Sequence, residues 1–343
     1  MFVRWEQQTV ELDASARLPG YRDVTVRHFD APEAVDTRFY EVQAKSILNR
    51  VPEASQVPFR WTVNPYRGCT HACVYCFARP THEYLEFDAG RDFEREIVVK
   101  VNAPERLRAE LARSGWQREH VALGTNTDPY QWVERRYELM RGIWEALRDA
   151  RNPCSVLTKS PLLLRDLDLM LELNAVTDFS AALSIPTLEQ KAWRATEPRS
   201  PSPSARLEAV AELSKAGIKT GVLVAPLMPG INDSPEQVRE VVRLATEAGA
   251  GYITGIALHL RRGVREVFME WLADKRPELV SQYEAAYRRG AYMPVAERRR
   301  LTRLLEGPLV PPRERFTRVL QIEPKVVQAP QPAYPATAQT SLF

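Results

Sequence analysis

The stretch NPYRGCTHACVYCF, residues 64–77, places three cysteines directly after a predicted strand. Cys69, Cys73 and Cys76 follow one another at spacings of four and three residues. These spacings let one loop wrap around a cuboid iron–sulfur cluster, with each thiolate on a different iron. The fourth iron then stays open, and an open position is what a catalytic metal site requires. Gly68 lets the backbone approach such a cluster closely. The stretch therefore predicts a catalytic [4Fe–4S] cluster.

A structural zinc ion is the alternative for the same cysteines, with His71 or His82 as the fourth ligand. Zinc sites usually combine two separated pairs of ligands, and the sequence holds no second pair of cysteines. Cys154 is the last of the four cysteines, so a disulfide framework spread along the chain is not indicated either. Clustered cysteines point instead to metal or redox chemistry inside the cell.

Short apolar runs alternate with amphipathic helical patterns along most of the chain. The runs do not alternate cleanly with polar residues, which is typical of strands buried on both faces. We expect strands at 59–64, 96–101, 120–124, 154–158, 178–185, 219–225 and 252–258. We expect helices at 103–114, 133–150, 162–173, 203–216 and 235–248. Strands that alternate with helices predict βαβ units and a parallel sheet. The expected fold is therefore α/β, a partial (β/α)6 barrel of the TIM type.

Four regions follow from this pattern. An N-terminal extension covers residues 1–57, the barrel-like core covers 58–262, and a C-terminal helical region covers 263–323. Residues 324–343 begin with PKVVQAPQPAYPATA, whose prolines and low charge predict a flexible, disordered linker. Functional groups in barrels of this kind lie at the carboxyl ends of the strands, so we expect the site there.

The pattern Cys-x-x-x-Cys-x-Tyr-Cys after the first strand of such a series resembles the motif of the radical S-adenosylmethionine (SAM) superfamily. The resemblance covers roughly residues 58–260. It implies two cofactors: a [4Fe–4S] cluster on the three cysteines, and a SAM molecule that binds the open iron. It also implies reductive cleavage of SAM to a 5′-deoxyadenosyl radical, and contact between Tyr75 and the adenine of SAM.

Further polar residues near predicted strand ends agree with this superfamily. The stretch GTNTDPYQ offers Asn126 and Asp128 to the amino group of SAM, although an ordinary Asn/Asp turn explains the same residues equally well. Lys159 ends an apolar strand, where its charge suits a ligand carboxylate better than a structural role. The resemblance implies that Ser184 and Glu197 bind the carboxylate and ribose of SAM.

The stretches GTNTDPYQ, TKS and EPRSPSPSARLEAV together resemble the subgroup related to spore photoproduct lyase, often called DNA repair photolyases. In the lyase reaction a cysteine near the end of the second strand returns a hydrogen atom. This sequence has Ala122-Leu-Gly-Thr there and no cysteine. Cys154 opens the third strand, at the end far from the chemistry, and is most simply a small buried residue. A tyrosine could replace the cysteine as donor, but the sequence selects none.

The last five residues, QTSLF, resemble the Gln-x-x-Leu-Phe peptide by which bacterial replication and repair proteins dock on the DNA sliding clamp. In such a peptide Leu342 and Phe343 fill an apolar pocket, and Gln339 satisfies polar groups at its rim. A frayed terminus is the alternative. With the family resemblance, the tail favours a DNA-acting enzyme recruited by the clamp.

The charge distribution is compatible with a DNA substrate but does not require one. The net charge is only +3 over 343 residues, yet nine arginines lie between residues 288 and 318. This basic segment could meet phosphate or form a solvated helix face. The alternative function is a radical SAM enzyme that modifies a peptide, a tRNA or a small molecule.

The composition is that of a globular cytosolic protein. The hydrophobic content is 44% and the charged content is 27%, which is typical of a chain with a normal core. No apolar run reaches the roughly 18 residues of a membrane span. Residues 1–20 also lack the apolar stretch of a secretory signal. We expect a cytoplasmic monomer that receives electrons from a flavodoxin- or ferredoxin-type donor.

Overall fold

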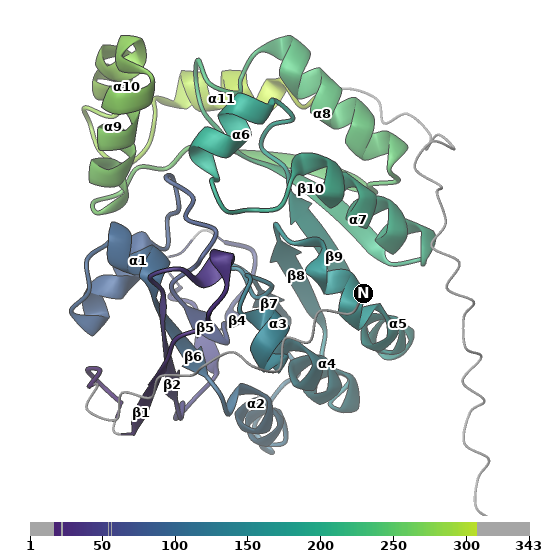
Figure 1. The fold of residues 1–343 in the computed structure, drawn as a ribbon. Helices are drawn as coiled ribbons and strands as arrows, with labels where there is room; N and C mark the ends of the chain where they lie inside the picture. Colours follow the sequence, from purple (N-terminus) through teal and green to yellow (C-terminus); the bar gives the residue numbers. More distant parts are fainter. Residues whose placement is uncertain (1–16, 22, 54, 56, 307–343) are drawn as a thin grey trace, which may run out of the picture.

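The strands form two sheets in the computed structural model, which describes residues 17–21, 23–53, 55 and 57–306 (Figure 1). The strands are Val24–Arg27 (β1), Arg38–Val42 (β2), Leu48–Arg50 (β3), Trp61–Val63 (β4), Tyr66–Arg67 (β5), Glu96–Lys100 (β6), Val121–Leu123 (β7), Cys154–Thr158 (β8), Phe179–Ser184 (β9), Lys219–Leu227 (β10) and Tyr252–Ala257 (β11). The larger sheet has the order β11-β10-β9-β8-β7-β4-β3, and the smaller has the order β1-β2-β6-β5.

Helices connect most of these strands. The α-helices are Arg91–Arg95 (α1), Ala103–Leu111 (α2), Glu134–Tyr137 (α3), Leu139–Asp149 (α4), Leu167–Val176 (α5), Gln190–Thr196 (α6), Pro203–Lys215 (α7), Pro235–Glu247 (α8), Val264–Lys275 (α9), Val280–Ala286 (α10) and Val295–Arg303 (α11). Short 3-10 helices are Pro32–Ala34 (η1), Arg79–Leu85 (η2), Pro161–Asp166 (η3) and Pro277–Leu279 (η4).

The larger sheet supplies the partial barrel that the sequence predicts. Strands β4, β7, β8, β9, β10 and β11 pair in parallel, and β3 joins β4 in antiparallel direction at one edge. Within the part of the chain that the structure describes, β3 and β11 are edge strands, so the sheet does not close. Helices α2, α4, α5, α7 and α8 lie along one side of it (Figure 1). The predicted α/β fold with six parallel strands is confirmed.

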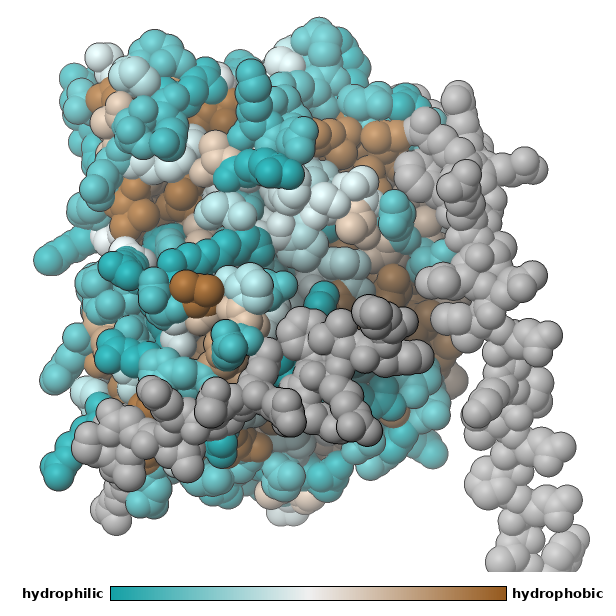
Figure 2. Space-filling view, in the orientation of Figure 1, coloured by the Kyte–Doolittle hydropathy of each residue, from teal (hydrophilic) through white to brown (hydrophobic). Residues whose placement is uncertain are grey.

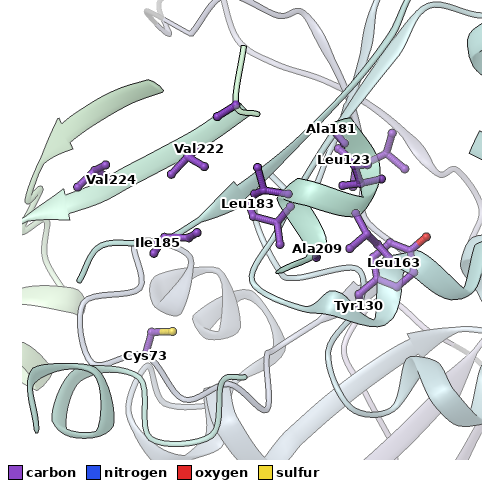
Figure 3. Close-up of a cluster of buried hydrophobic side chains, with 14 of the residues drawn as sticks. Cys73, Leu123, Tyr130, Leu163, Ala181, Leu183, Ile185, Ala209, Val222 and Val224 are labelled. Atoms are coloured by element: carbon purple, nitrogen blue, oxygen red, sulfur yellow. The ribbon is translucent and has the colours of Figure 1, made fainter. Parts of the chain in front are cut away.

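Aliphatic side chains fill the interior of the barrel. On the face shown in Figure 2, hydrophilic residues cover most of the surface, and hydrophobic residues gather in separate patches. Figure 3 shows Leu123, Leu183 and Val222, from β7, β9 and β10, lying together inside the molecule. Burying a side chain of this size contributes about 1.5–3 kcal/mol. Cys73 belongs to the same buried cluster, so the cysteine loop, residues 64–77, rests directly on the barrel core.

The helix predicted at 133–150 is broken into α3 and α4. Glu138, between them, has a left-handed backbone with φ of 48°. The buried carboxylate of Glu134 accepts hydrogen bonds from the backbone N–H of Met140, at 3.0 Å, and from Arg165, at 2.6 Å. Glu134 therefore satisfies a free backbone donor at the start of α4. Amphipathic spacing alone cannot show such a break.

The strand predicted at 96–101 belongs to the smaller sheet and not to the barrel. β6 pairs in parallel with β2 and in antiparallel direction with β5. Its buried Glu96 accepts hydrogen bonds from Arg38, at 2.6 Å, and from Tyr40, at 2.8 Å, both on β2. The apolar run predicted a buried strand, but its partners come from a distant part of the sequence. Strands β1, β2 and β3 all lie in the segment that precedes the expected core.

Helices α9, α10 and α11 follow the barrel, where the sequence predicts a helical region. His259, just after β11, forms an isolated β-bridge with Tyr292 and links this region to the end of the sheet. Residues 307–343, which include the QTSLF peptide, lie outside the described residues. In the part of the chain that the structure covers, no helix has the length and apolar character needed to cross a membrane.

Candidate active site

One cavity opens at the carboxyl ends of the parallel strands and has a volume of about 220 Å³. Its wall includes Cys69, Cys73 and Cys76 from the cysteine loop. Residues predicted to contact SAM line it as well, namely Tyr75, Asn126, Asp128, Lys159 and Ser184. Glu197 is buried behind this wall, in contact with Tyr75 and Lys159. The fold thus brings together predicted residues from five separate stretches of the sequence.

The cysteine loop fits an iron–sulfur cluster. The backbone N–H groups of His71 and Asp128 act to lower the pKa of the Cys69 thiol, and that of Ala78 acts in the same way on Cys76. Such donors stabilise thiolates that bind a cluster. Burial raises the pKa of Cys69 to about 12 and raises the pKa of the other two thiols. The thiols are therefore neutral until iron displaces their protons.

The geometry does not favour the zinc alternative. Among the described residues, no three His, Cys, Asp or Glu side chains converge where a single metal ion could bind. Cysteines spread around a cavity fit a larger cluster. His82 Nε2 bonds to the backbone oxygen of Glu96 at 2.8 Å, and His82 does not line the cavity. His71 does line it, but its Nδ1 lies 3.4 Å from Oδ2 of Asp128.

Two residues that the sequence analysis did not single out hold the cysteine loop in place. The buried guanidinium of Arg79 donates to the backbone oxygen of Cys73 at 2.9 and 3.1 Å. The side chain of Gln131 donates to the backbone oxygen of Gly68 at 3.1 Å and accepts from the N–H of Thr70 at 2.9 Å. Gln131 closes the stretch GTNTDPYQ, so its place in that stretch was the available signal.

Gly68 is required by packing on the side of the smaller sheet. Its φ is +79°, and a Cβ there would lie 2.8 Å from Ile97 and 2.9 Å from His82. A side chain would therefore displace the cysteine loop from β6. This contact gives Gly68 a structural role that does not depend on a cluster.

A polar network lies directly behind the cavity. Nζ of Lys159 donates to Oγ of Ser184 at 2.7 Å and lies 3.3 Å from Oε1 of Glu197. The hydroxyl of Tyr75 and the guanidinium of Arg206 also donate to the Glu197 carboxylate. An ammonium group carries three N–H donors. Lys159 therefore keeps one donor for a ligand in the cavity.

This network keeps the positive charge of Lys159 in the wall of the cavity. Burial acts to raise the pKa of Glu197, but the neighbouring Arg206 and Lys159 outweigh burial and lower this pKa to about 2. Glu197 is thus ionised near neutral pH, and its one negative charge faces two positive charges. The positive charge of Lys159 favours an anionic ligand group, such as a carboxylate, beside it.

Asn126 and Asp128 differ in how free their side chains are. Oδ1 of Asp128 accepts from the hydroxyl of Thr158 at 2.6 Å and from the N–H of Tyr130 at 2.9 Å. Oδ2 accepts from the N–H of Lys159 at 2.7 Å, so this carboxylate ties the loop after β7 to the end of β8. Asn126 faces the cavity, and its amide has no partner among the described residues. Its amide is therefore available to a ligand.

Cys154 lies at the start of β8, at the opposite end of the strand from the cavity, and it is fully buried. The sequence predicts this placement. Over the described residues, the cavity wall contains no thiol apart from those of the cysteine loop. The cavity therefore offers no separate cysteine as a hydrogen donor.

The cysteine loop, the parallel strands and the cavity at their carboxyl ends define a class of protein. The model of the radical SAM superfamily matches residues 63–254, which is more than half of the chain. The chain belongs to the radical SAM superfamily. Proteins of this superfamily use a [4Fe–4S] cluster and SAM. Membership of the superfamily therefore confirms the two cofactors predicted from the sequence.

Individual relatives agree with this assignment. An uncharacterized protein of Mycobacterium tuberculosis is 46% identical over 304 residues, which cover 87% of this chain and 89% of the relative. An uncharacterized protein of Methanocaldococcus jannaschii is 29% identical and covers 56% of this chain and 69% of its own. The solved structure of spore photoproduct lyase complexed with dinucleoside spore photoproduct has a TM-score of 0.58 at 17% identity. It covers 77% of this chain and 76% of the lyase chain, which shows a shared fold.

Replacing Cys73 by alanine is expected to remove the cluster, because the loss of one thiolate opens the cube. Anaerobically purified wild-type protein should be brown and contain about four irons per chain. The variant should lose both colour and iron, whereas Cys154→Ala should keep both. Metal analysis and visible absorbance measure this. Stoichiometric zinc without visible absorbance in the wild type would contradict the cluster.

Arg206→Met is expected to lower the free energy of unfolding by about 3–5 kcal/mol, because it leaves the buried charge of Glu197 without its main partner. The double variant Glu197→Gln/Arg206→Met should lose clearly less, since the fully buried carboxylate is gone and the charge that remains, on Lys159, borders the cavity. Urea unfolding followed by circular dichroism measures both values. Equal losses in the two variants would show that the ion pair has little influence on stability.

Proposed function

We propose that this radical SAM protein is an enzyme that reductively cleaves SAM in the cavity and acts on DNA in a repair-type reaction. The observation that carries the proposal is that three cysteine thiols and the ammonium of Lys159 line one cavity at the carboxyl ends of the strands. When bound, the cluster and SAM would supply a 5′-deoxyadenosyl radical that abstracts a hydrogen atom from the substrate.

The residues that line the cavity have distinct roles in this proposal. Lys159 binds the carboxylate of SAM with its remaining N–H, while Ser184 holds the ammonium in place at 2.7 Å. Asn126 offers its free amide to the amino-acid part of SAM. Tyr75, whose hydroxyl is fixed by Glu197, presents its ring to the adenine.

Glu197 and Asp128 act mainly as positioning residues in this proposal. Glu197 is buried and orients Lys159 and Tyr75. Asp128 orients the backbone of Lys159 and the ring of His71. The amino group of SAM would contact Asp128 only at the part of the Asp128 carboxylate that lines the cavity.

Two observations support DNA as the substrate class. Spore photoproduct lyase, whose fold this chain shares, was solved with a dinucleoside photoproduct. The basic segment exposes Arg288, Arg289 and Arg299. Because the cavity wall offers no separate cysteine among the described residues, we propose that hydrogen return differs from that of the lyase. The same observation favours the alternative, a peptide, tRNA or small-molecule substrate.

Other partners are proposed from the sequence. Gln339, Leu342 and Phe343 would bind the bacterial sliding clamp, and these residues lie outside the described part of the chain. A flavodoxin- or ferredoxin-type protein would supply the electron for SAM cleavage. A cytoplasmic location and a monomeric state complete the proposal.

Lys159→Ala should weaken SAM binding about 10- to 100-fold, because a charge-assisted hydrogen bond contributes about 1.5–3 kcal/mol. Asn126→Ala should have a smaller effect, since its hydrogen bond is neutral. Lys275→Ala, an exposed lysine on α9, is the matched control and should bind SAM normally. Equilibrium binding and release of 5′-deoxyadenosine from reduced protein measure these effects. Absence of 5′-deoxyadenosine from cluster-loaded, reduced wild type would contradict the proposed chemistry.

A peptide of residues 329–343 should bind the bacterial sliding clamp with micromolar affinity, because a flexible segment with two apolar anchors loses entropy on binding. Leu342→Ala with Phe343→Ala should abolish binding, whereas Thr340→Ala with Ser341→Ala should preserve it. Calorimetric titration against purified clamp measures the affinity. A lack of saturable binding up to millimolar peptide would refute recruitment through the tail.

A further inference from the structure

A column of stacked side chains leads from the cavity to helix α11. His259 lines the cavity, and its ring stacks on Tyr292 with centroids 4.3 Å apart and planes 22° apart. The guanidinium of Arg298 lies over the ring of Tyr292, 5.5 Å from its centroid. We call these three residues the stacking column. It connects the proposed active site to the basic segment without a break.

The backbone holds this column in a fixed position. The β-bridge between His259 and Tyr292 joins the chain after β11 to the turn before α11. The N–H of Leu260 donates to the oxygen of Ala291 at 2.9 Å, next to that bridge. The column therefore rests on the end of the barrel sheet and does not depend on a long flexible loop.

The surface around the column is more apolar than an ordinary protein surface requires. Tyr292 is 60% exposed although its ring is large. Phe77 and Ile256, which line the cavity, are 48% and 56% exposed. The guanidinium of Arg261 donates to the backbone oxygen of Phe77 at 2.6 and 2.9 Å and bridges two sides of this opening. Adjacent exposed apolar side chains of this kind, bordered by polar groups, mark a binding surface.

Positive charge continues beyond the column along α11. A groove of about 360 Å³ there is lined by Arg298, Arg299, Thr302 and Arg303, with Glu306 at its end. No ion pair within the described residues engages the three arginines. Arg300, on the same helix, instead pairs with Asp233 and Glu297, so it is not available to a ligand.

We propose that the stacking column and the α11 groove form a track for one strand of DNA. A base stacks on the face of Tyr292 that the Arg298 guanidinium covers in the structure, and the guanidinium so released joins Arg299 and Arg303 along the phosphates. Aromatic rings that stack with bases, next to guanidinium groups that meet phosphates, are the features by which proteins hold single-stranded nucleic acid. The track leads an unpaired or extruded nucleotide into the cavity beside His259. This inference rests on the proposed DNA function.

Fluorescence anisotropy with a labelled 12-nucleotide single-stranded DNA and the matching duplex tests the track on cluster-loaded protein. Wild type should bind the single strand more tightly than the duplex. Tyr292→Ala should weaken single-strand binding about 5- to 100-fold, because stacking of one base is lost. Tyr292→Phe keeps the ring and should bind like wild type. Iron content and thermal midpoint confirm that both variants are folded.

The salt dependence tests the groove separately. For single strands, the slope of log affinity against log salt falls by about 0.7 for each lost phosphate contact. Arg299→Gln with Arg303→Gln should therefore reduce the slope by about 1.4. Arg300→Gln also removes a positive charge from α11, but this guanidinium is already paired with Asp233 and Glu297. The salt dependence of DNA binding by this variant should therefore stay near that of wild type.

The outcomes distinguish the track from the proposed function. If wild type binds single-stranded DNA but Tyr292→Ala and Arg299→Gln/Arg303→Gln bind equally well, the track is wrong and the DNA function stands. If wild type binds neither DNA form at low salt, the proposed DNA function fails and the track fails with it. Tighter binding of an RNA of the same sequence would overturn the assignment to DNA.

Discussion

The proposed site depends most on the contacts that the buried carboxylate of Glu197 makes with three other side chains. This carboxylate receives the hydroxyl of Tyr75 from the cysteine loop, the ammonium of Lys159 from the end of β8, and the guanidinium of Arg206 from α7. Arg206 also donates to the backbone oxygen of Ser184 at the end of β9. One ionised group therefore fixes the relative positions of elements that are far apart in the sequence. Removing the charge of either Glu197 or Arg206 would leave the charge of the other buried without its partner.

The same network explains why the cavity can hold an anionic group next to three cysteines. The thiols must lose their protons to bind iron, which places negative charge in a buried region. Lys159 borders that region and Arg206 lies behind it, next to the single negative charge of Glu197, while Asp128 adds a second carboxylate at the cavity wall. Backbone N–H groups beside Cys69 and Cys76 also act to lower the pKa of these thiols. The two cations and the backbone N–H groups thus offset part of the negative charge that thiolates bring to this region.

Local patterns in the sequence predicted those features of the site that residues close together in the chain determine. The three cysteines lie in one loop, and Lys159 stands out because a charge ends an apolar strand, so the sequence singled out both, and both line the cavity. Arg206 was missed because it lies in an amphipathic helix, where an arginine is usually solvated. The sheet that contains β6 was missed because its pairing with β2 joins residues about 60 positions apart. Interactions of this range leave no periodic signal in a single sequence.

The central claim is that Cys69, Cys73 and Cys76 hold a cluster whose fourth iron binds SAM. Electron–nuclear double resonance on the reduced protein tests it most directly, with SAM that carries ¹⁵N in its amino group or ¹⁷O in its carboxylate. An open iron predicts magnetic coupling between the cluster and the labelled atoms, since both groups would bind that iron. A reduced cluster whose spectrum does not change when SAM is added, with no coupling to either label, would contradict the claim.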